Sequence, residues 1–271
     1  MIKKDKICLK TSGIISKSSR CLHNHCQLSI VNCQFGEATK FQFVCLIKNS
    51  AEGFFPGRNL LQYPGKDGGG MEILYEDRDL AVIVKPVGPD SETEVPAMLT
   101  EGLGGAFFPV HRLDRNVGGV MVYARTKQAA AELSRLAQHG ALVKEYYALV
   151  TGIPPERGIL EDLLWKDGKK NKVFVVKRER AGVKPAKLEY RRLSAGEQSL
   201  VRVRLHTGRS HQIRVQFASR GYPLVGDHKY GARDPETAPR LFSCSLTFPW
   251  KGKTMGFEAA PDWVPGSATE K

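Results

Sequence analysis

The sequence predicts an α+β fold in which strands predominate. The run 80–84 is apolar throughout and follows a polar turn, as a buried strand does. The run 200–205 alternates apolar and charged residues, and this period of two is typical of a half-buried strand. Segments 129–137 and 211–218 instead repeat their apolar residues with helical spacing. Several strands with two clear helices are compatible with a layered α+β domain.

Composition limits the class of protein. With 271 residues the chain can form one sizeable core or two small ones. Its 41% hydrophobic and 25% charged residues are ordinary for a soluble globular protein. No apolar run approaches the ~18 residues that a membrane span requires, and no secretory signal is recognisable. We therefore expect a cytoplasmic protein without a membrane partner, and we expect it to act as a monomer.

The net charge of +13 indicates a polyanionic partner. Residues 71–271 hold 31 Lys and Arg against 24 Asp and Glu, so the positive excess does not depend on the N-terminal segment. The most basic stretch is 166–192, with eleven basic residues against three acidic ones. An acidic membrane surface is the alternative partner, but the chain shows no long amphipathic basic helix. Nucleic acid is therefore the expected partner.

Residues 1–70 differ in character from the rest of the chain. Their apolar residues occur in short clusters, without the periodicity that would build one core. Five of the six cysteines lie here, but the cluster 21–26 fits no familiar zinc-ligand spacing. Three glycines precede Met71, and glycine codons can encode the purine-rich sequence found before bacterial start codons. We predict that residues 1–70 are a disordered or spurious extension and that Met71 is the true start.

A carboxylate between two arginines marks the first candidate site. Segment 111–119 reads HRLDRNVGG, so Asp114 lies between Arg112 and Arg115, ahead of the apolar run 120–124. A flexible glycine pair next to a buried strand could hold a reactive aspartate in a fixed position. The alternative is a turn residue with a surface ion pair, which is the commoner meaning of such a short motif.

Two further segments carry candidate residues. Tyr146 lies in the predicted strand 144–152, where it is either a site residue or a core-facing aromatic. Lys166, Lys169, Lys170 and Lys172 lie in and around a Gly-Lys-Lys-Asn turn that is typical of a hairpin tip between apolar strands. Such a charged run is either a solvated face or a phosphate contact.

The longest motif lies in residues 206–231. After the strand 200–205, Ser210 is placed to cap the helix 211–218, which Gly221 ends. Ile213 and Phe217 share one face of this helix at a spacing of four. The chain then continues through Gly-Tyr-Pro and Gly-Asp-His-Lys-Tyr-Gly.

Taken together, these motifs resemble those of the RluA-type pseudouridine synthases in order and spacing, over about residues 71–260. The matching elements are HRLD at 111–114, Lys-Pro-x-Gly at 85–88, Lys-x-Tyr-x-Ala at 144–148, TGRSHQIRV at 207–215, Gly-x-Pro at 221–223 and Gly-Asp-x-x-Tyr-Gly at 226–231. The chain departs from the family where Val117 and Gly118 replace Thr-Ser. It departs again at Gln216, which replaces a frequent His and which we expect to face RNA or solvent. Residues 1–70 do not resemble the S4-type RNA-binding domain of many relatives.

The resemblance implies a fold, an activity and a site. The fold would be a mixed, largely antiparallel sheet with a central catalytic cleft, and residues 71–271 would be the catalytic domain. The activity would be isomerisation of uridine to pseudouridine in structured rRNA or tRNA, with no cofactor and no metal. The implied catalytic residues are Asp114 as the essential carboxylate, Arg214 as its cation and Tyr146 against the target base. The expected RNA contacts are His111, Arg112, Arg115, Lys169, Lys170, Lys172, Arg209 and His211.

Two other functions are compatible with the same residues. A non-catalytic RNA-binding protein is favoured if Val117 and Gly118 spoil the loop that presents Asp114. A glycosidase-like enzyme would use Asp114 to hydrolyse a nucleoside bond, but such enzymes normally employ two carboxylates and the motif supplies one.

Overall fold

The computed structural model describes residues 15–20, 27–34, 40–42 and 71–265, and the chain divides into two units, Met1–Gly57 and Arg58–Lys271. In the first unit, β1 (Ile15–Arg20) pairs antiparallel with β2 (Gln27–Gln34), which pairs antiparallel with β3 (Lys40–Gln42). The sequence did not predict this small sheet. The cysteine and histidine cluster at 21–26 lies outside the described residues, and the start at Met71 stays a prediction.

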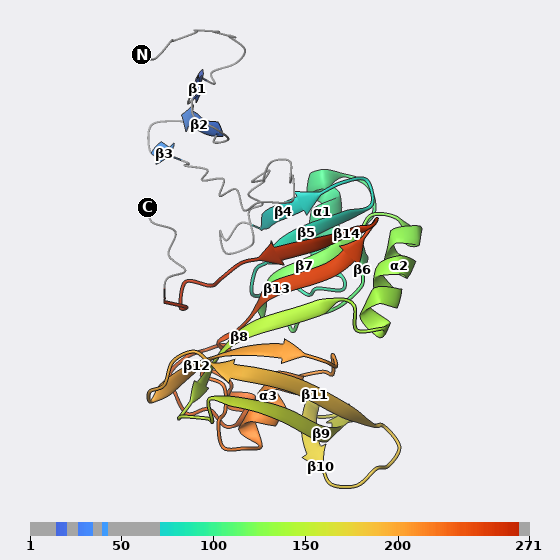
Figure 1. Ribbon diagram of the computed structural model, residues 1–271, viewed down its shortest axis with the longest axis vertical. Helices are drawn as coiled ribbons and strands as arrows, with labels where there is room; N and C mark the ends of the chain where they lie inside the picture. Colours follow the sequence, from blue (N-terminus) through green and yellow to red (C-terminus); the bar gives the residue numbers. More distant parts are fainter. Residues whose placement is uncertain (1–14, 21–26, 35–39, 43–70, 266–271) are drawn as a thin grey trace. The chain divides into compact units, whose positions relative to one another are not determined.

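The second unit is built on one mixed sheet, ordered β10-β9-β11-β12-β8-β13-β7-β5-β4, with β14 beside β13 and β6 beside β7 (Figure 1). Its strands are β4 Glu72–Glu76, β5 Leu80–Lys85, β6 Phe108–Pro109, β7 Gly118–Ala124, β8 Val143–Thr151, β9 Arg157–Asp167, β10 Lys172–Val176, β11 Val183–Arg192, β12 Gln198–Leu205, β13 Leu241–Trp250 and β14 Lys253–Glu258. Among these strands only the β13–β7 pair runs parallel. The predicted mixed, largely antiparallel sheet is confirmed.

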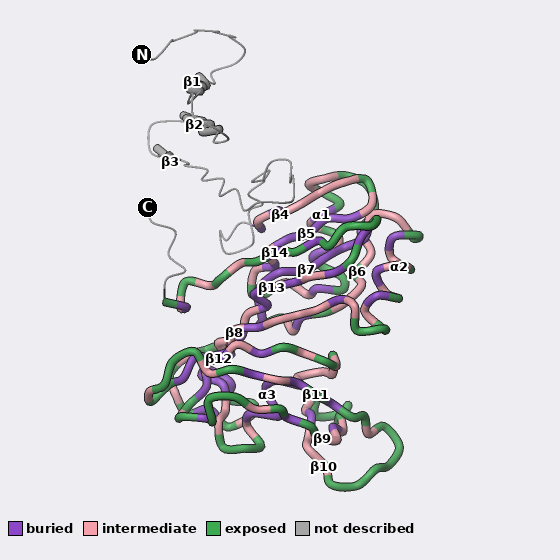
Figure 2. The backbone as a smooth tube through the Cα atoms, in the orientation of Figure 1, coloured by how far each residue is buried: buried purple, intermediate pink, exposed green. Residues whose placement is uncertain are grey.

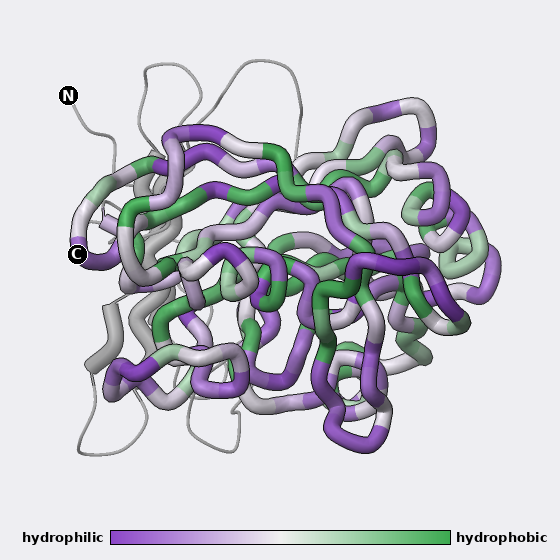
Figure 3. The backbone as a smooth tube through the Cα atoms, turned by 90° about the horizontal axis from the view of Figure 1, so that it is seen from below, coloured by the Kyte–Doolittle hydropathy of each residue, from purple (hydrophilic) through white to green (hydrophobic). Residues whose placement is uncertain are grey.

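The helices of this unit are α1 (Glu94–Leu103), α2 (Lys127–Gln138) and α3 (Gln212–Ala218), with a short 3-10 helix η2 at His228–Tyr230. Apolar side chains of α1 and α3 belong to one core cluster, whereas those of α2 belong to a second cluster. Strand β7 contributes side chains to both clusters, and every one of its residues is buried (Figure 2). Figure 3 shows the hydrophobic stretches along interior segments and hydrophilic stretches in many loops. In the part of the chain that is described, no helix is long and apolar enough to cross a membrane.

The local sequence predicts helix α2 but not helix α1. The Thr126 hydroxyl accepts a hydrogen bond from the Ala129 N–H at 3.1 Å and so caps α2, which contains the predicted helical segment 129–137. Helix α1 was not predicted, because Pro96 and Gly102 interrupt its pattern. Pro96 lies in the first turn, where a missing N–H costs no intrahelical bond.

Two expectations about α3 are wrong. Ser210 does not cap the helix, which begins at Gln212 after His211 in a left-handed conformation (φ +50°), with no side-chain cap. The Gln212 side-chain oxygen instead accepts the Arg209 N–H at 3.0 Å. Gln216 does not face RNA or solvent either. It is fully buried, and its amide donates to the Leu160 carbonyl at 3.1 Å and to Asp162 at 2.7 Å, because α3 packs against β9.

Gly119, the second residue of β7, is required by the sheet. Gly119 has φ +123°, and a Cβ there would overlap the backbone of Ser243 on β13. We expect Gly119→Ala to destabilise the protein by about 3 kcal/mol or more, because backbone strain and backbone overlap act together. Urea unfolding measures the loss. Gly168→Ala is the control, since a Cβ there meets nothing within 4 Å; equal stabilities of the two variants would contradict the prediction.

Candidate active site

A buried lysine holds the loop that carries Asp114. The Lys85 ammonium donates to the carbonyl of the adjacent Pro86 at 2.8 Å and to those of Val117 at 3.0 Å and Arg115 at 3.4 Å, so two of its three bonds reach the loop that carries Asp114. Lys85 has no exposed surface, and burial lowers its pKa to about 8. The sequence placed Lys85 in the Lys-Pro-x-Gly element but gave it no role in the site. The signal that could have identified Lys85 is its position directly at the end of a buried apolar strand.

The replacement of Thr-Ser by Val117 and Gly118 does not spoil this loop. The Val117 N–H still donates to the Asp114 carbonyl at 3.0 Å, and the Val117 side chain is buried in the core. A Cβ on Gly118 would lie 3.5 Å from the Phe242 ring and 3.1 Å from the Lys85 carbonyl. The missing side chain therefore leaves room for Phe242, its partner across the parallel pair.

Arg214 joins two carboxylates. Its Nε and Nη2 donate to Asp227 at 2.6 and 2.8 Å, and its Nη1 donates to Oδ2 of Asp114 at 2.8 Å. The Arg214 side chain is 8% exposed, that of Asp227 is 1% and that of Asp114 is 21%. Burial alone would lower the pKa of Arg214, but the hydrogen bonds and charges of the two aspartates outweigh burial and raise it. The site thus holds a permanent cation against a carboxylate that solvent can reach.

His211 lies beside the same carboxylate. Its Nε2 is 3.7 Å from Oδ2 of Asp114, and its Nδ1 is 2.8 Å from the Tyr230 hydroxyl. Burial lowers the pKa of His211 to about 4, although the Asp114 charge acts in the opposite direction. The imidazole is therefore neutral at physiological pH. Asp227 and Tyr230 were not among the predicted site residues.

Tyr146 and Tyr147 point to opposite faces of β8. Tyr146 is 5% exposed and belongs to the core cluster that includes α1 and α3, whereas Tyr147 lies under the Arg202 guanidinium on the other face. Burial raises the pKa of Tyr146, and the Asp114 carboxylate contributes in the same direction. Tyr146 is therefore a neutral phenol near Asp114, and it cannot act as a phenolate base at pH 7.

The arginines that flank Asp114 are paired with acidic side chains. Arg112 lies 2.7 Å from Glu92, and Arg115 lies 2.6 Å from Glu94, just ahead of and within the first turn of α1. Both arginine side chains are 56% exposed. His111, in contrast, is turned inward: its Nε2 accepts the Val122 N–H at 3.2 Å, and burial lowers its pKa to about 3. This neutral, inward ring does not fit the expected RNA contact.

The predicted basic hairpin is present, with its turn between β9 and β10. Lys169 and Lys170 are exposed, and their backbone N–H groups donate to the Asp167 carboxylate. Lys172 is only half-exposed, because its ammonium lies 5.4 Å from the Tyr230 ring centroid and 5.8 Å from that of Phe174. Arg209 is held by the Pro185 carbonyl at 2.9 Å. The hairpin therefore offers two free cations and one that is packed on aromatic rings.

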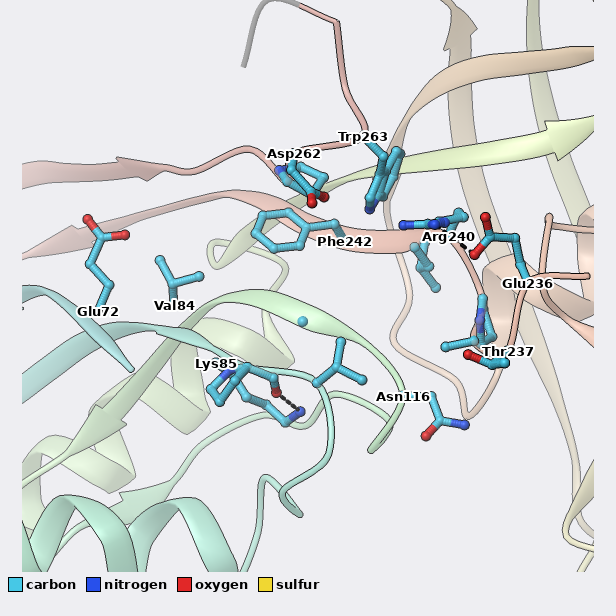
Figure 4. Close-up of a pocket in the computed structure, with 17 residues that line it drawn as sticks. Glu72, Val84, Lys85, Asn116, Glu236, Thr237, Arg240, Phe242, Asp262 and Trp263 are labelled. Carbon is cyan, nitrogen blue, oxygen red and sulfur yellow. Dashed lines mark hydrogen bonds and ion pairs between the residues drawn. The ribbon is translucent and has the colours of Figure 1, made fainter. Parts of the chain in front are cut away.

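A separate pocket of about 700 Å³ lies next to the Asp114 loop, and Asn116, Arg240, Phe242 and Trp263 contribute to its wall (Figure 4). Asp114, Tyr146 and Arg214 do not line it. Its charged side chains are mainly acidic, and Arg240 is paired with Glu236 at 2.7 Å. The pocket therefore does not suit phosphate. Over the residues described, no group of three or more His, Cys, Asp or Glu side chains is placed to hold a metal ion.

Comparison with known proteins identifies the family. The model of the RNA pseudouridylate synthase family matches residues 81–219. An uncharacterized RNA pseudouridine synthase of Aquifex aeolicus is 36% identical over 219 residues, covering 69% of this chain and 68% of that protein. The dual-specificity RNA pseudouridine synthase RluA of Escherichia coli is 35% identical over 214 residues, covering 71% of this chain and 94% of RluA.

The fold has a counterpart among solved structures. Human RNA pseudouridylate synthase domain containing 1 superposes with a TM-score of 0.65 at 24% identity, covering 73% of this chain and 86% of that one. The sheet topology and the family match agree with the resemblance carried by the motifs. The chain therefore belongs to the RluA-type RNA pseudouridine synthases, enzymes that isomerise uridine within RNA.

Proposed function

We propose that this enzyme converts uridine to pseudouridine in structured rRNA or tRNA, with Asp114 as its essential carboxylate. The observation that carries the assignment is the chain Asp114–Arg214–Asp227, in which a buried guanidinium held by Asp227 donates a hydrogen bond to the solvent-accessible carboxylate of Asp114 and orients it. The motifs lie in residues 71–271, which we propose as the catalytic domain. We further propose that the enzyme acts as a monomer in the cytoplasm.

The proposed roles follow from the reaction. The bond from N1 of uracil to C1′ of ribose breaks, the base turns, and C5 joins C1′, so nothing is oxidised or hydrolysed. Asp114 acts as nucleophile or balances the charge that develops as the glycosidic bond breaks. Arg214 donates a hydrogen bond to the Asp114 carboxylate and orients it. Tyr146, as a neutral phenol, packs against the base and can donate or accept a hydrogen bond, but does not itself serve as an anionic base.

RNA binding is assigned to exposed cations near Asp114. A uridine in structured RNA must leave its stack to react, and Arg112 and Arg115 are placed beside Asp114 to brace the vacated space. Their present partners, Glu92 and Glu94, are exposed, so phosphate can compete for both arginines. Arg209 and the basic hairpin extend this surface. His111 is left out, because its ring serves the backbone of β7.

Tritium at C5 of uridine tests the reaction directly. The label is released to water only if the base is rejoined through C5, whereas hydrolysis of the glycosidic bond would free uracil with its label intact. Total RNA from cells that lack this gene is the substrate, so that the target uridine is unmodified. We expect release of label with no free base. Free uracil, or RNA binding without release of label, would overturn the assignment.

The hairpin can be tested by the salt dependence of RNA binding. We expect Lys169→Gln with Lys170→Gln to weaken binding without altering the chemical step, and to reduce the salt-dependence slope by up to about one unit per lost phosphate contact. The control is Lys251→Gln with Lys253→Gln, at the turn after β13 and at the first residue of β14. RNA-binding titrations at several salt concentrations measure this slope. An unchanged slope would assign the hairpin lysines to an ordinary solvated face.

A further inference from the structure

Tyr230 connects the basic hairpin to the Asp114 site. Its hydroxyl accepts the Val173 N–H of β10 at 2.9 Å and lies 2.8 Å from Nδ1 of His211. Its ring lies 5.2 Å from the Arg214 guanidinium carbon and 5.4 Å from the Lys172 ammonium. One phenol thus contacts a cation of the site, a cation of the hairpin, the backbone of the hairpin and the imidazole beside Asp114.

These contacts determine which nitrogen of His211 carries the proton. The Tyr230 oxygen already accepts the Val173 N–H, so its own hydrogen needs an acceptor, and Nδ1 of His211 is the one within reach among the described residues. A neutral imidazole that accepts at Nδ1 carries its hydrogen on Nε2. That nitrogen is the one turned toward Asp114, 3.7 Å from Oδ2.

Both neighbours of Asp114 therefore approach the same oxygen. Arg214 donates to Oδ2 at 2.8 Å, and the His211 Nε2–H faces Oδ2 from another side. A separation of 3.7 Å is too long for a hydrogen bond, but catalytic hydrogen bonds often shorten when the substrate binds. In the described part of the chain, no hydrogen bond or ion pair engages Oδ1.

We propose that Tyr230 is a positioning residue that fixes His211 as its Nε2–H tautomer, so that His211 and Arg214 hold Oδ2 of Asp114 and leave Oδ1 to meet the substrate. This proposal rests on the function assigned to Asp114 above. The strained backbone of His211, with φ +50°, agrees with it, because such strain persists where surrounding contacts fix a residue in place.

A neutral donor is suited to this place. A protonated imidazole would form an ion pair with Asp114 and lower the nucleophilicity of its carboxylate. A neutral N–H donor orients the carboxylate without neutralising its charge. The charges that face His211 are Asp114 and Asp227, which favour protonation, and Arg214 and Lys229, which oppose it. Burial is the largest influence on the pKa of His211 and favours the neutral ring. The Tyr230 hydrogen bond to Nδ1 also favours the neutral ring.

The tautomer can be observed in the full-length protein without RNA. Histidine labelled with ¹⁵N distinguishes Nε2–H, Nδ1–H and doubly protonated rings by nuclear magnetic resonance, and His211→Gln identifies the His211 signals among those of the 7 histidines. We expect an Nε2–H tautomer in the wild type at pH 7. Tyr230→Phe removes only the hydroxyl and should give mixed tautomers with a His211 pKa above the wild-type value. Tyr222→Phe, which removes a different partly buried hydroxyl, should leave the wild-type pattern.

Activity supplies the second readout. We expect Tyr230→Phe to lower kcat by roughly 10- to 100-fold, as a small misplacement of a reacting group does. The acid limb of its kcat profile should move to higher pH, with little change in KM. A wild-type His211 that carries its proton on Nδ1, or is doubly protonated at pH 7, would overturn the proposal, as would an unchanged tautomer and pH profile in Tyr230→Phe. The tautomer is read without turnover, so its failure is distinct from failure of the assignment of Asp114.

Discussion

Asp114→Asn is expected to reduce tritium release from C5-labelled uridine by at least about a thousandfold. The amide keeps the size of the carboxylate but removes its charge and its nucleophilicity. Arg214 is retained on the Asp227 side by two hydrogen bonds, so the surrounding structure should persist. RNA binding should change by less than about twofold, because the proposed phosphate contacts come from other residues.

Three measurements make this prediction specific. Tritium release reports the reaction, RNA titration reports binding, and thermal unfolding reports whether the variant is folded. Asp262→Asn, at an exposed carboxylate outside the site, is the matched control and should retain the wild-type rate. If Asp114→Asn releases label at the wild-type rate while folded, the essential carboxylate lies elsewhere and the role of Arg214 must be assigned again.

The parts of the fold that the sequence predicted depend on neighbouring residues. The helical spacing of α2 and the hairpin turn at Lys169 and Lys170 are set within a few positions, so local pattern was sufficient. Helix α1 was missed because Pro96 and Gly102 are unfavourable in a helix interior, and burial of Val95 and Leu99 under the sheet overrides that preference.

The site depends on contacts between distant residues. Asp114 and Arg214 are 100 positions apart, and no periodicity relates them, so only the family resemblance could pair them before the structure was known. Asp227 carried no signal as a charge, because a sequence does not show which charged side chains are buried. Gln216 was misplaced for the same reason: its polar amide suggested exposure, whereas the carbonyl of Leu160 and the carboxylate of Asp162 on β9 accept hydrogen bonds from its NH2 group inside the protein.

We propose that Arg214 serves both folding and catalysis, and substitution at a second position separates the two roles. Arg214→Met should leave Asp227 buried without its cation, which typically costs about 3 to 5 kcal/mol of folding free energy. It should also remove the cation from Asp114 and thereby abolish most of the activity. Loss of activity in this variant alone would therefore not distinguish an unfolded protein from a disabled site.

The double variant Arg214→Met with Asp227→Asn removes the Arg214 guanidinium together with the Asp227 carboxylate that would otherwise be left buried and unpaired. We expect urea unfolding to show most of the lost stability restored, because a buried amide is far less costly than an uncompensated carboxylate. Tritium release should stay as low as in the single variant, since Asp114 still lacks its cation. Arg214→Lys should be intermediate in both measurements, because an ammonium keeps the charge but cannot reproduce the two-pronged contact with Asp227 while reaching Asp114. Recovery of activity together with stability in the double variant would show that Arg214 serves folding alone.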